Sequence, residues 1–260
     1  MTQFGAQMFT LRDSCANPDA IATSLERVKA MGYDGVQASA AGFNTLDESE
    51  LKQIKKALDD NGLVCAATHE SLENMRDHTE AVITKHQILD CNYTALGGTL
   101  WGGGSQEDWA AFASEFNLVT SKLNEAGLRA GYHNHSHEFA IFEDGSTPMD
   151  ILLANFDPQV WLELDVYWVA HGLADPAAWI AKIAASGTDR IPCVHYKDGT
   201  VNGDREHIMM PVGSGNLNWP RINSACAEAG VEWKLVERDS GPHDPFDALE
   251  IAIKNMRRQG

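Results

Sequence analysis

Positive charge is scarce in this 260-residue chain, which has 20 lysines and arginines against 37 aspartates and glutamates and a net charge of −17. A field of that sign repels phosphate backbones, so we expect no nucleic-acid partner. No apolar stretch reaches the roughly 18–20 residues that cross a bilayer, so we expect no membrane partner. The first residues, MTQFGAQMF, lack the basic and apolar segments of a secretion signal, which predicts a cytoplasmic location.

Cysteines are few and unpaired in their spacing. The five do not form a CxxC motif, and four of them lie in apolar runs. We therefore expect buried thiols rather than a disulfide or a cysteine-bound metal. A glycine-rich GxGxxG loop after an early strand is also missing, and this argues against a doubly wound open sheet that binds a dinucleotide.

Strand and helix patterns alternate about every thirty residues along the whole chain. Strands are expected at 4–9, 34–38, 63–68, 93–96, 129–133, 161–165, 191–195 and 233–237. Between the first two strands, Ile21, Leu25 and Val28 share one helical face, with a cap at Asn17 and a stop at Gly32. Eight such units predict an α/β fold, a (β/α)8 TIM barrel formed by residues 1–260 as a single domain. Residues 199–218 are expected to be irregular.

Residues able to bind a metal or move a proton recur at the ends of the late strands. Asp165, His195 and Glu237 each end a strand pattern, and Glu138 follows the fifth. In a parallel barrel these ends converge at one mouth. Three carboxylates and one imidazole suit Mn²⁺, Mg²⁺ or Co²⁺, and a cation among them relieves their repulsion. We therefore predict that these four residues hold a divalent metal.

The segment 132–139, YHNHSHEF, is rich in polar side chains. His133, His135 and His137 alternate and would share a face in an extended chain, so a three-histidine Zn²⁺ site is an alternative. That alternative leaves the carboxylates without a purpose. We favour a substrate-facing role for His133 and its neighbours, with His137 exposed.

Other polar and aromatic residues are candidates for substrate contact. Lys197 shares a strand face with His195, where its ammonium could hold a substrate oxygen or stabilise an enediolate. His69, at the end of strand three, is a candidate for proton transfer or for a satisfied core residue. Gln7 and Gln37 end strands one and two and could bond hydroxyls. Trp101 and Trp168 could pack on a sugar face, although core packing is the alternative for either.

These motifs resemble the xylose isomerase-like barrel superfamily, in the branch of sugar phosphate isomerases and epimerases. The matching pieces are AQMFTLRD at 6–13, YHNHSHEF at 132–139, LELDVYWV at 162–169, VHYKD at 194–198, GSGNLNWP at 213–220 and VERD at 236–239. The resemblance implies a divalent metal, commonly manganese, held by Glu138, Asp165, His195 and Glu237. Many relatives place the strand-five glutamate where this chain has Asn134 or His135. Such relatives are often dimers or tetramers, so the resemblance implies a homo-oligomer as partner.

The predicted reaction is a sugar isomerisation or epimerisation through an enediolate. A metal would chelate a carbonyl and an adjacent hydroxyl, and His135, His69 or Glu138 would take the α-proton. Strand two ends in Gln37, where many relatives have a glutamate base, and glutamine cannot accept that proton. HNH-signature relatives resemble inosose dehydratases and enzymes of 3-keto-glycosides, so a lyase is the runner-up. An abasic-DNA endonuclease and a non-catalytic sugar-binding protein are the remaining alternatives.

Overall fold

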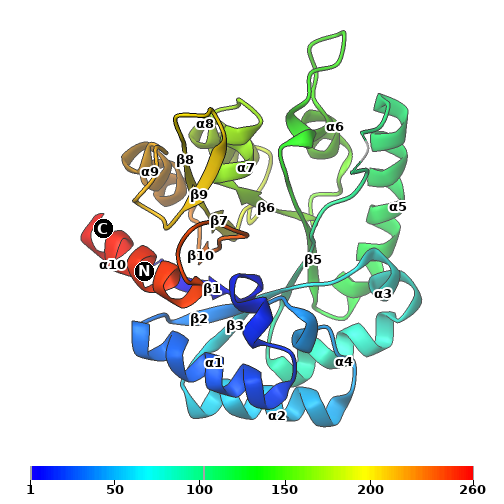
Figure 1. Ribbon diagram of the computed structural model, residues 1–260. Coiled ribbons are helices and arrows are strands. Elements are labelled where there is room, and N and C mark those ends of the chain that lie inside the picture. The colour runs from blue at the N-terminus through cyan, green and yellow to red at the C-terminus, as the bar shows by residue number, and fades with distance from the viewer. Residues whose placement is uncertain (1, 102, 260) are drawn as a thin grey trace.

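The computed structural model describes residues 2–101 and 103–259, and its centre is a closed barrel of parallel strands (Figure 1). The barrel strands are β1 (Gln3–Gln7), β2 (Gly35–Ala38), β3 (Val64–His69), β4 (Tyr93–Leu96), β5 (Arg129–His133), β6 (Trp161–Asp165), β7 (Cys193–Tyr196) and β10 (Trp233–Val236). Pairing of β1 with both β2 and β10 closes the ring. The (β/α)8 barrel expected from the sequence is therefore confirmed.

Helices surround the barrel and follow the capping signals in the sequence. They are α1 (Pro18–Met31), α2 (Glu48–Asp60), α3 (Leu72–Asp77), α4 (Thr79–Leu89), α5 (Gln106–Glu125), α6 (Pro148–Asn155), α7 (Val166–His171), α8 (Pro176–Ala185), α9 (Trp219–Ala229) and α10 (Pro245–Gln259). The Asn17 side chain accepts from the Ala20 amide at the start of α1, and Gly32 ends that helix at φ 99°. Only a residue that tolerates the left-handed region suits this stop. No helix in the described part of the chain has the length and apolarity that a bilayer crossing requires.

Among the described residues, three short 3-10 helices follow strand ends: η1 (Met8–Ser14), η2 (Ala41–Phe43) and η3 (His137–Phe139). The first strand was expected to run to residue 9, but it ends at Gln7. The Gln7 side chain accepts a hydrogen bond from the Phe9 amide and so starts η1. A side-chain cap competes with the sheet ladder for this amide, which strand propensity alone does not reveal.

The segment 199–218, expected to be irregular, contains an antiparallel hairpin of β8 (Asp198–Val201) and β9 (His207–Met210). The buried Asp198 carboxylate fixes the chain after it by accepting from the Gly213 and Gly215 amides, each at 2.9 Å, and from the Trp219 indole at 2.8 Å. The expectation was wrong because the strands are only four residues long, which is too short for a clear alternation.

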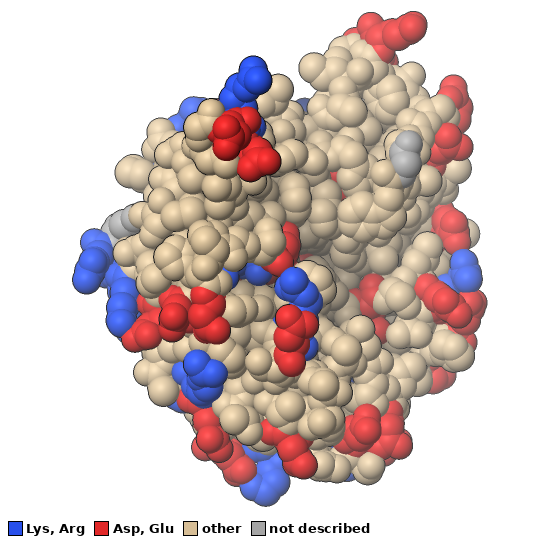
Figure 2. Space-filling model, viewed as in Figure 1, with Lys and Arg blue, Asp and Glu red and all other residues tan. Residues whose placement is uncertain are grey.

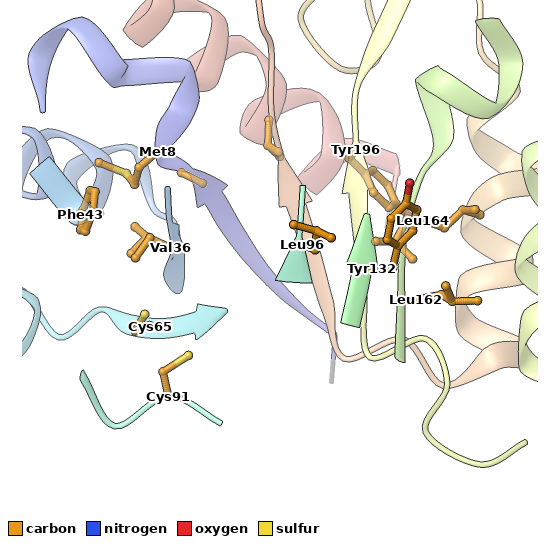
Figure 3. Packing of buried hydrophobic residues seen from close by; sticks show 14 of the residues in the cluster. Met8, Val36, Phe43, Cys65, Cys91, Leu96, Tyr132, Leu162, Leu164 and Tyr196 are labelled. Atoms are coloured by element: carbon orange, nitrogen blue, oxygen red, sulfur yellow. The ribbon is translucent and has the colours of Figure 1, made fainter. Parts of the chain in front are cut away.

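Apolar residues fill two layers. The larger one lies between strands and helices, where side chains such as Val36, Phe43 and Leu164 pack (Figure 3). All five cysteines are buried free thiols, as expected. The smaller layer closes the amino-terminal end of the barrel with Trp161 and Trp233. A Cβ on Gly131 would approach the Trp161 ring within 2.5 Å, so glycine makes room for it.

The barrel interior changes character along each strand. In β6, Trp161, Glu163 and Asp165 occupy alternate positions, and in β10 Trp233 and Leu235 lead to Glu237. Alternate residues of a strand point to the same face, so the apolar layer gives way to charged groups towards the carboxyl ends. The mouth of the barrel is therefore polar.

Candidate active site

Four strand-end side chains meet at the mouth and are here called the metal set: His133, Asp165, His195 and Glu237. One potential ligand atom from each lies within 4.8 Å of the others, and all four residues are buried. Two imidazole nitrogens and two carboxylate oxygens form a donor set suited to a divalent ion. Like charges this close also favour a cation between them.

The orientation of His195 fits a metal ligand. Its Nε2 lies 2.6 Å from the Gln37 side-chain oxygen, and the Gln37 amide nitrogen donates to Glu163 at 2.7 Å. A carboxylate only accepts, so the Gln37 oxygen faces His195 and Nε2 must carry hydrogen. The buried Nδ1 has no hydrogen bond within the described structure and lies 2.9 Å from Glu237 Oε2. Glu163 and Glu237 raise the His195 pKa against burial, so an ion entering the metal set would displace the Nδ1 proton and bind that nitrogen.

Glu138, predicted as the strand-five ligand, is not part of the metal set. Its carboxylate accepts from the Tyr132 hydroxyl at 2.7 Å and from the His135 amide at 2.9 Å. Burial raises its pKa, although His137 opposes this. The turn into η3 directs the side chain away from the mouth. His133, assigned by the sequence to substrate contact, supplies the potential ligand atom from strand five in the metal set.

Glu163, which the sequence analysis missed, lies fully buried below the metal set. Its Oε2 is 2.6 Å from His69 Nε2 and 3.3 Å from His195 Nε2. Burial raises the Glu163 pKa, but the interactions with His195 and His69 outweigh it and hold the pKa well below its usual range. Its position two residues before Asp165 was the signal that could have revealed it.

Lys197 lies between carboxylates beside the metal set. Its Nζ is 3.1 Å from Asp165, 2.8 Å from Glu237 and 3.0 Å from Asp239. Burial alone lowers the Lys197 pKa, but these three carboxylates raise it above its usual value. Burial and then the charge of Glu237 raise the Asp239 pKa to about 7, against the effect of Lys197. Asp239 is a further site residue that the sequence analysis missed.

Aromatic rings form one side of the mouth. His135 lies between Trp101 and Trp168, with ring centroids 4.5 Å and 5.4 Å away. Burial, followed by the charges of His133 and Lys197, lowers the His135 pKa to about 2, so this imidazole is neutral. His135 Nδ1 and Trp168 Nε1 have no hydrogen-bond partner among the described residues. Trp101 is 62% exposed, at the open edge.

The remaining predicted contacts are held inside the protein. Both ends of the Gln37 amide bond to His195 and Glu163, and the Gln7 oxygen bonds to the Phe9 amide. The Asn134 oxygen accepts from the Asp165 amide at 3.0 Å. These three amides bond within the protein and help to position the site, and substrate contact by them stays a prediction. His137 is half-buried, and its Nε2 lies 2.9 Å from the Thr99 carbonyl.

Comparisons with known proteins agree with this architecture. A crystal structure described as a sugar phosphate isomerase/epimerase from Parabacteroides distasonis is 23% identical, covers 98% of both chains and has a TM-score of 0.80. A probable 3-DHS dehydratase of Bacillus anthracis is 12% identical over 99% of both chains, with a TM-score of 0.73. A 3-keto-D-glucoside 4-epimerase of E. coli is 14% identical over 99% of this chain and 100% of its own, with a TM-score of 0.69.

These likenesses show the fold, and no curated protein matches the chain. The family described as the xylose isomerase-like TIM barrel matches residues 25–259, which is most of the sequence. The chain therefore belongs to the xylose isomerase-like TIM barrel family.

Proposed function

We propose that this protein is a divalent-metal-dependent isomerase or epimerase of a keto-sugar or sugar derivative. The observation that carries the proposal is the metal set of two imidazoles and two carboxylates, buried beside His69. Manganese is the proposed ion because the resemblance implies it and the set offers two carboxylates and no thiolate, while the two imidazoles also suit Zn²⁺ or Co²⁺. Most relatives described above are themselves named as isomerases or epimerases, which supports the reaction class.

A divalent ion bound by the metal set would polarise a carbonyl and so acidify the adjacent C–H. The protein must then supply a base. His69 is best placed among the three candidates, because its Nε2 is fixed 2.6 Å from the buried Glu163 carboxylate. A carboxylate accepts the Nε2 hydrogen, which leaves the lone pair on Nδ1. The His69 side chain is 18% exposed, so that lone pair can take a proton at the mouth.

The other two candidates suit different roles. Glu138 is fully buried and bonded within its own turn. His135, with a pKa near 2, is too weak a base for efficient proton abstraction, and its unpartnered Nδ1 is buried beside Trp101. The three donors of the buried Lys197 ammonium face Asp165, Glu237 and Asp239, so its charge would act on a developing oxyanion from beside the metal set.

A metal-dependent lyase that eliminates a β-oxygen is the second candidate. The observation favouring it is the full engagement of Gln37, which leaves strand two without a proton-transfer group. An epimerase needs proton transfer on two faces of the substrate, whereas elimination needs one base and a leaving group. The dehydratase among the structural relatives supports this alternative.

Proton exchange tests the proposal. Protein loaded with Mn²⁺ would be incubated in D₂O with a panel of ketoses, inososes and 3-keto-glucosides and followed by NMR. We expect deuterium next to the carbonyl, and the product then separates an isomerase from a lyase. Stoichiometric metal with no exchange into any of these compounds would refute both reactions.

A further inference from the structure

A second recognition region opens on the same mouth, over β1, β2 and β3. It is a cavity of about 570 Å³, here called the β1–β3 cavity. Its lining includes Phe9, Arg12, Ser39, Asn44, Glu70 and Asn74. His69 also borders it, so the cavity begins at the proposed base. A volume of that size accommodates more than the small group that reacts at the metal set.

The lining offers groups that recognise a hydroxylated ring. The Ser39 hydroxyl and the Asn44 amide form no side-chain hydrogen bond within residues 2–101 and 103–259, so both remain available. The Asn74 amide donates to Glu70 at 3.2 Å and retains acceptor capacity. Phe9 is 37% exposed and presents an apolar ring face. Adaptable donors and acceptors beside an exposed ring fit a sugar with an apolar face and a polar edge.

The same lining does not concentrate the positive charge that a phosphate site uses. The Arg12 guanidinium already donates to the carbonyls of Phe9 and Asp239, at 3.0 and 2.9 Å. Glu70 is paired with the buried Lys85 ammonium, and the exposed Asp13 carboxylate adds negative charge at the rim. Lys85 neutralises Glu70, and the Asp13 carboxylate offsets the charge of Arg12, so the lining holds no excess of positive charge to attract a phosphate dianion. On the face shown in Figure 2, basic side chains are scattered among acidic ones and form no extended patch.

We propose that the β1–β3 cavity binds a neutral sugar unit joined by a glycosidic bond to the reacting ketose. The substrate is then a ketose glycoside or a similar two-ring compound, rather than a sugar phosphate. This inference rests on the proposed function for the reacting unit. The recognition of the second unit is a property of the cavity alone, and it can be measured without turnover.

The test compares fructose with three of its glycosides, lactulose, turanose and isomaltulose, and with fructose 6-phosphate and inorganic phosphate. Dissociation constants would be measured by calorimetry on Mn²⁺-loaded protein. We expect at least one disaccharide to bind about tenfold more tightly than fructose, and phosphate not to compete. Tighter binding of fructose 6-phosphate than of every disaccharide would overturn the proposal, and so would equal binding of fructose and all three disaccharides.

A matched pair of variants locates the effect. Asn44→Trp fills the cavity from an exposed position and should remove the disaccharide advantage while leaving fructose binding unchanged. Asn92→Trp alters an exposed residue before β4, at the opposite end of the barrel, and should change neither. An unchanged disaccharide affinity in Asn44→Trp would also overturn the proposal. Deuterium exchange measured on the same samples separates the proposed reaction from the proposed sugar subsite. If no deuterium is exchanged but Asn44→Trp still removes the disaccharide advantage, the reaction is refuted and the subsite stands.

Discussion

The two halves of the barrel mouth differ in how they hold their polar groups. The β5, β6, β7 and β10 half buries its charges and bonds them to one another, as the contacts of Asp165, Lys197 and Glu237 show. The β1, β2 and β3 half presents exposed side chains such as Phe9 and Asn44 around a cavity. Fixed charges suit a reaction that needs preorganised groups, and exposed side chains suit recognition. We infer that metal binding and substrate selection are divided between the halves, with the proposed base His69, at the end of β3, on the border between them.

The largest effect is expected from removing a potential metal ligand in the β5, β6, β7 and β10 half. His133→Ala should lose bound Mn²⁺, and because a bound ion contributes several kcal/mol to the transition state, activity should fall about a thousandfold or more. Glu138→Gln is the matched control, since Glu138 lies outside the metal set, and it should retain the metal. Metal analysis of both purified variants decides the matter. Loss of metal from Glu138→Gln alone would assign the ligand to that residue instead.

Removing the proposed base should leave the metal in place. His69→Gln should lower kcat by about 10²–10⁴-fold, the usual contribution of general base catalysis, with Mn²⁺ content unchanged. His207→Gln, at an exposed position on β9, serves as the control and should keep full activity. If His69→Gln retains its kcat, the proton is taken by another group.

The stability of the β5, β6, β7 and β10 half should depend on the buried Lys197 ammonium. Lys197→Met leaves Asp165, Glu237 and Asp239 without their ammonium, and breaking a buried pair of this kind costs about 3–5 kcal/mol. Urea unfolding in EDTA should show this loss, and saturating Mn²⁺ should reduce it because the ion supplies the missing charge. Lys234→Met, which removes a half-buried lysine bonded to Asn223, should show no such dependence on metal. Equal losses with and without Mn²⁺ would contradict the account.

Two buried histidines, His195 in the metal set and His86 outside it, have pKa values shifted in opposite directions. Burial lowers the His195 pKa, but Glu163 and Glu237 outweigh it and raise the pKa, whereas burial lowers the His86 pKa to about 4. His86 is held neutral, with Nδ1 2.7 Å from the Val82 carbonyl and Nε2 2.7 Å from the Thr68 hydroxyl.

The unfolded chain protonates His86 near pH 6.5 and the folded chain only near 4. The stability held by the neutral ring is therefore complete above 6.5 and is lost as pH falls towards 4. The loss is about 3 kcal/mol. Urea unfolding of the native protein and of His86→Gln at several pH values checks this, and an unchanged slope in the variant would refute it.

The smallest expected effect comes from a substitution in the β1, β2 and β3 half. Phe9→Ala removes an exposed ring, so unfolding free energy should change by less than about 0.5 kcal/mol. Disaccharide affinity should fall a fewfold, while fructose affinity stays the same. An equal loss for both ligands would place Phe9 against the reacting unit instead of the second one.

The sequence could predict the barrel and much of the mouth, because periodicity and strand ends are local properties. Asp165, His195 and Glu237 end strands that the topology makes neighbours. The potential ligand from strand five was harder to predict, because the turn into η3 directs Glu138 to Tyr132. Residue spacing does not reveal that turn. The contact of Lys197 with Asp239 likewise joins residues 42 apart, and only the pairing of β7 with β10 brings them together.

Anomalous X-ray diffraction at the manganese edge, on crystals grown with Mn²⁺, tests the central claim most directly. We predict one strong peak within bonding distance of His133, Asp165, His195 and Glu237. A peak bonded to Glu138, or none beside His195 at saturating Mn²⁺, would contradict the account.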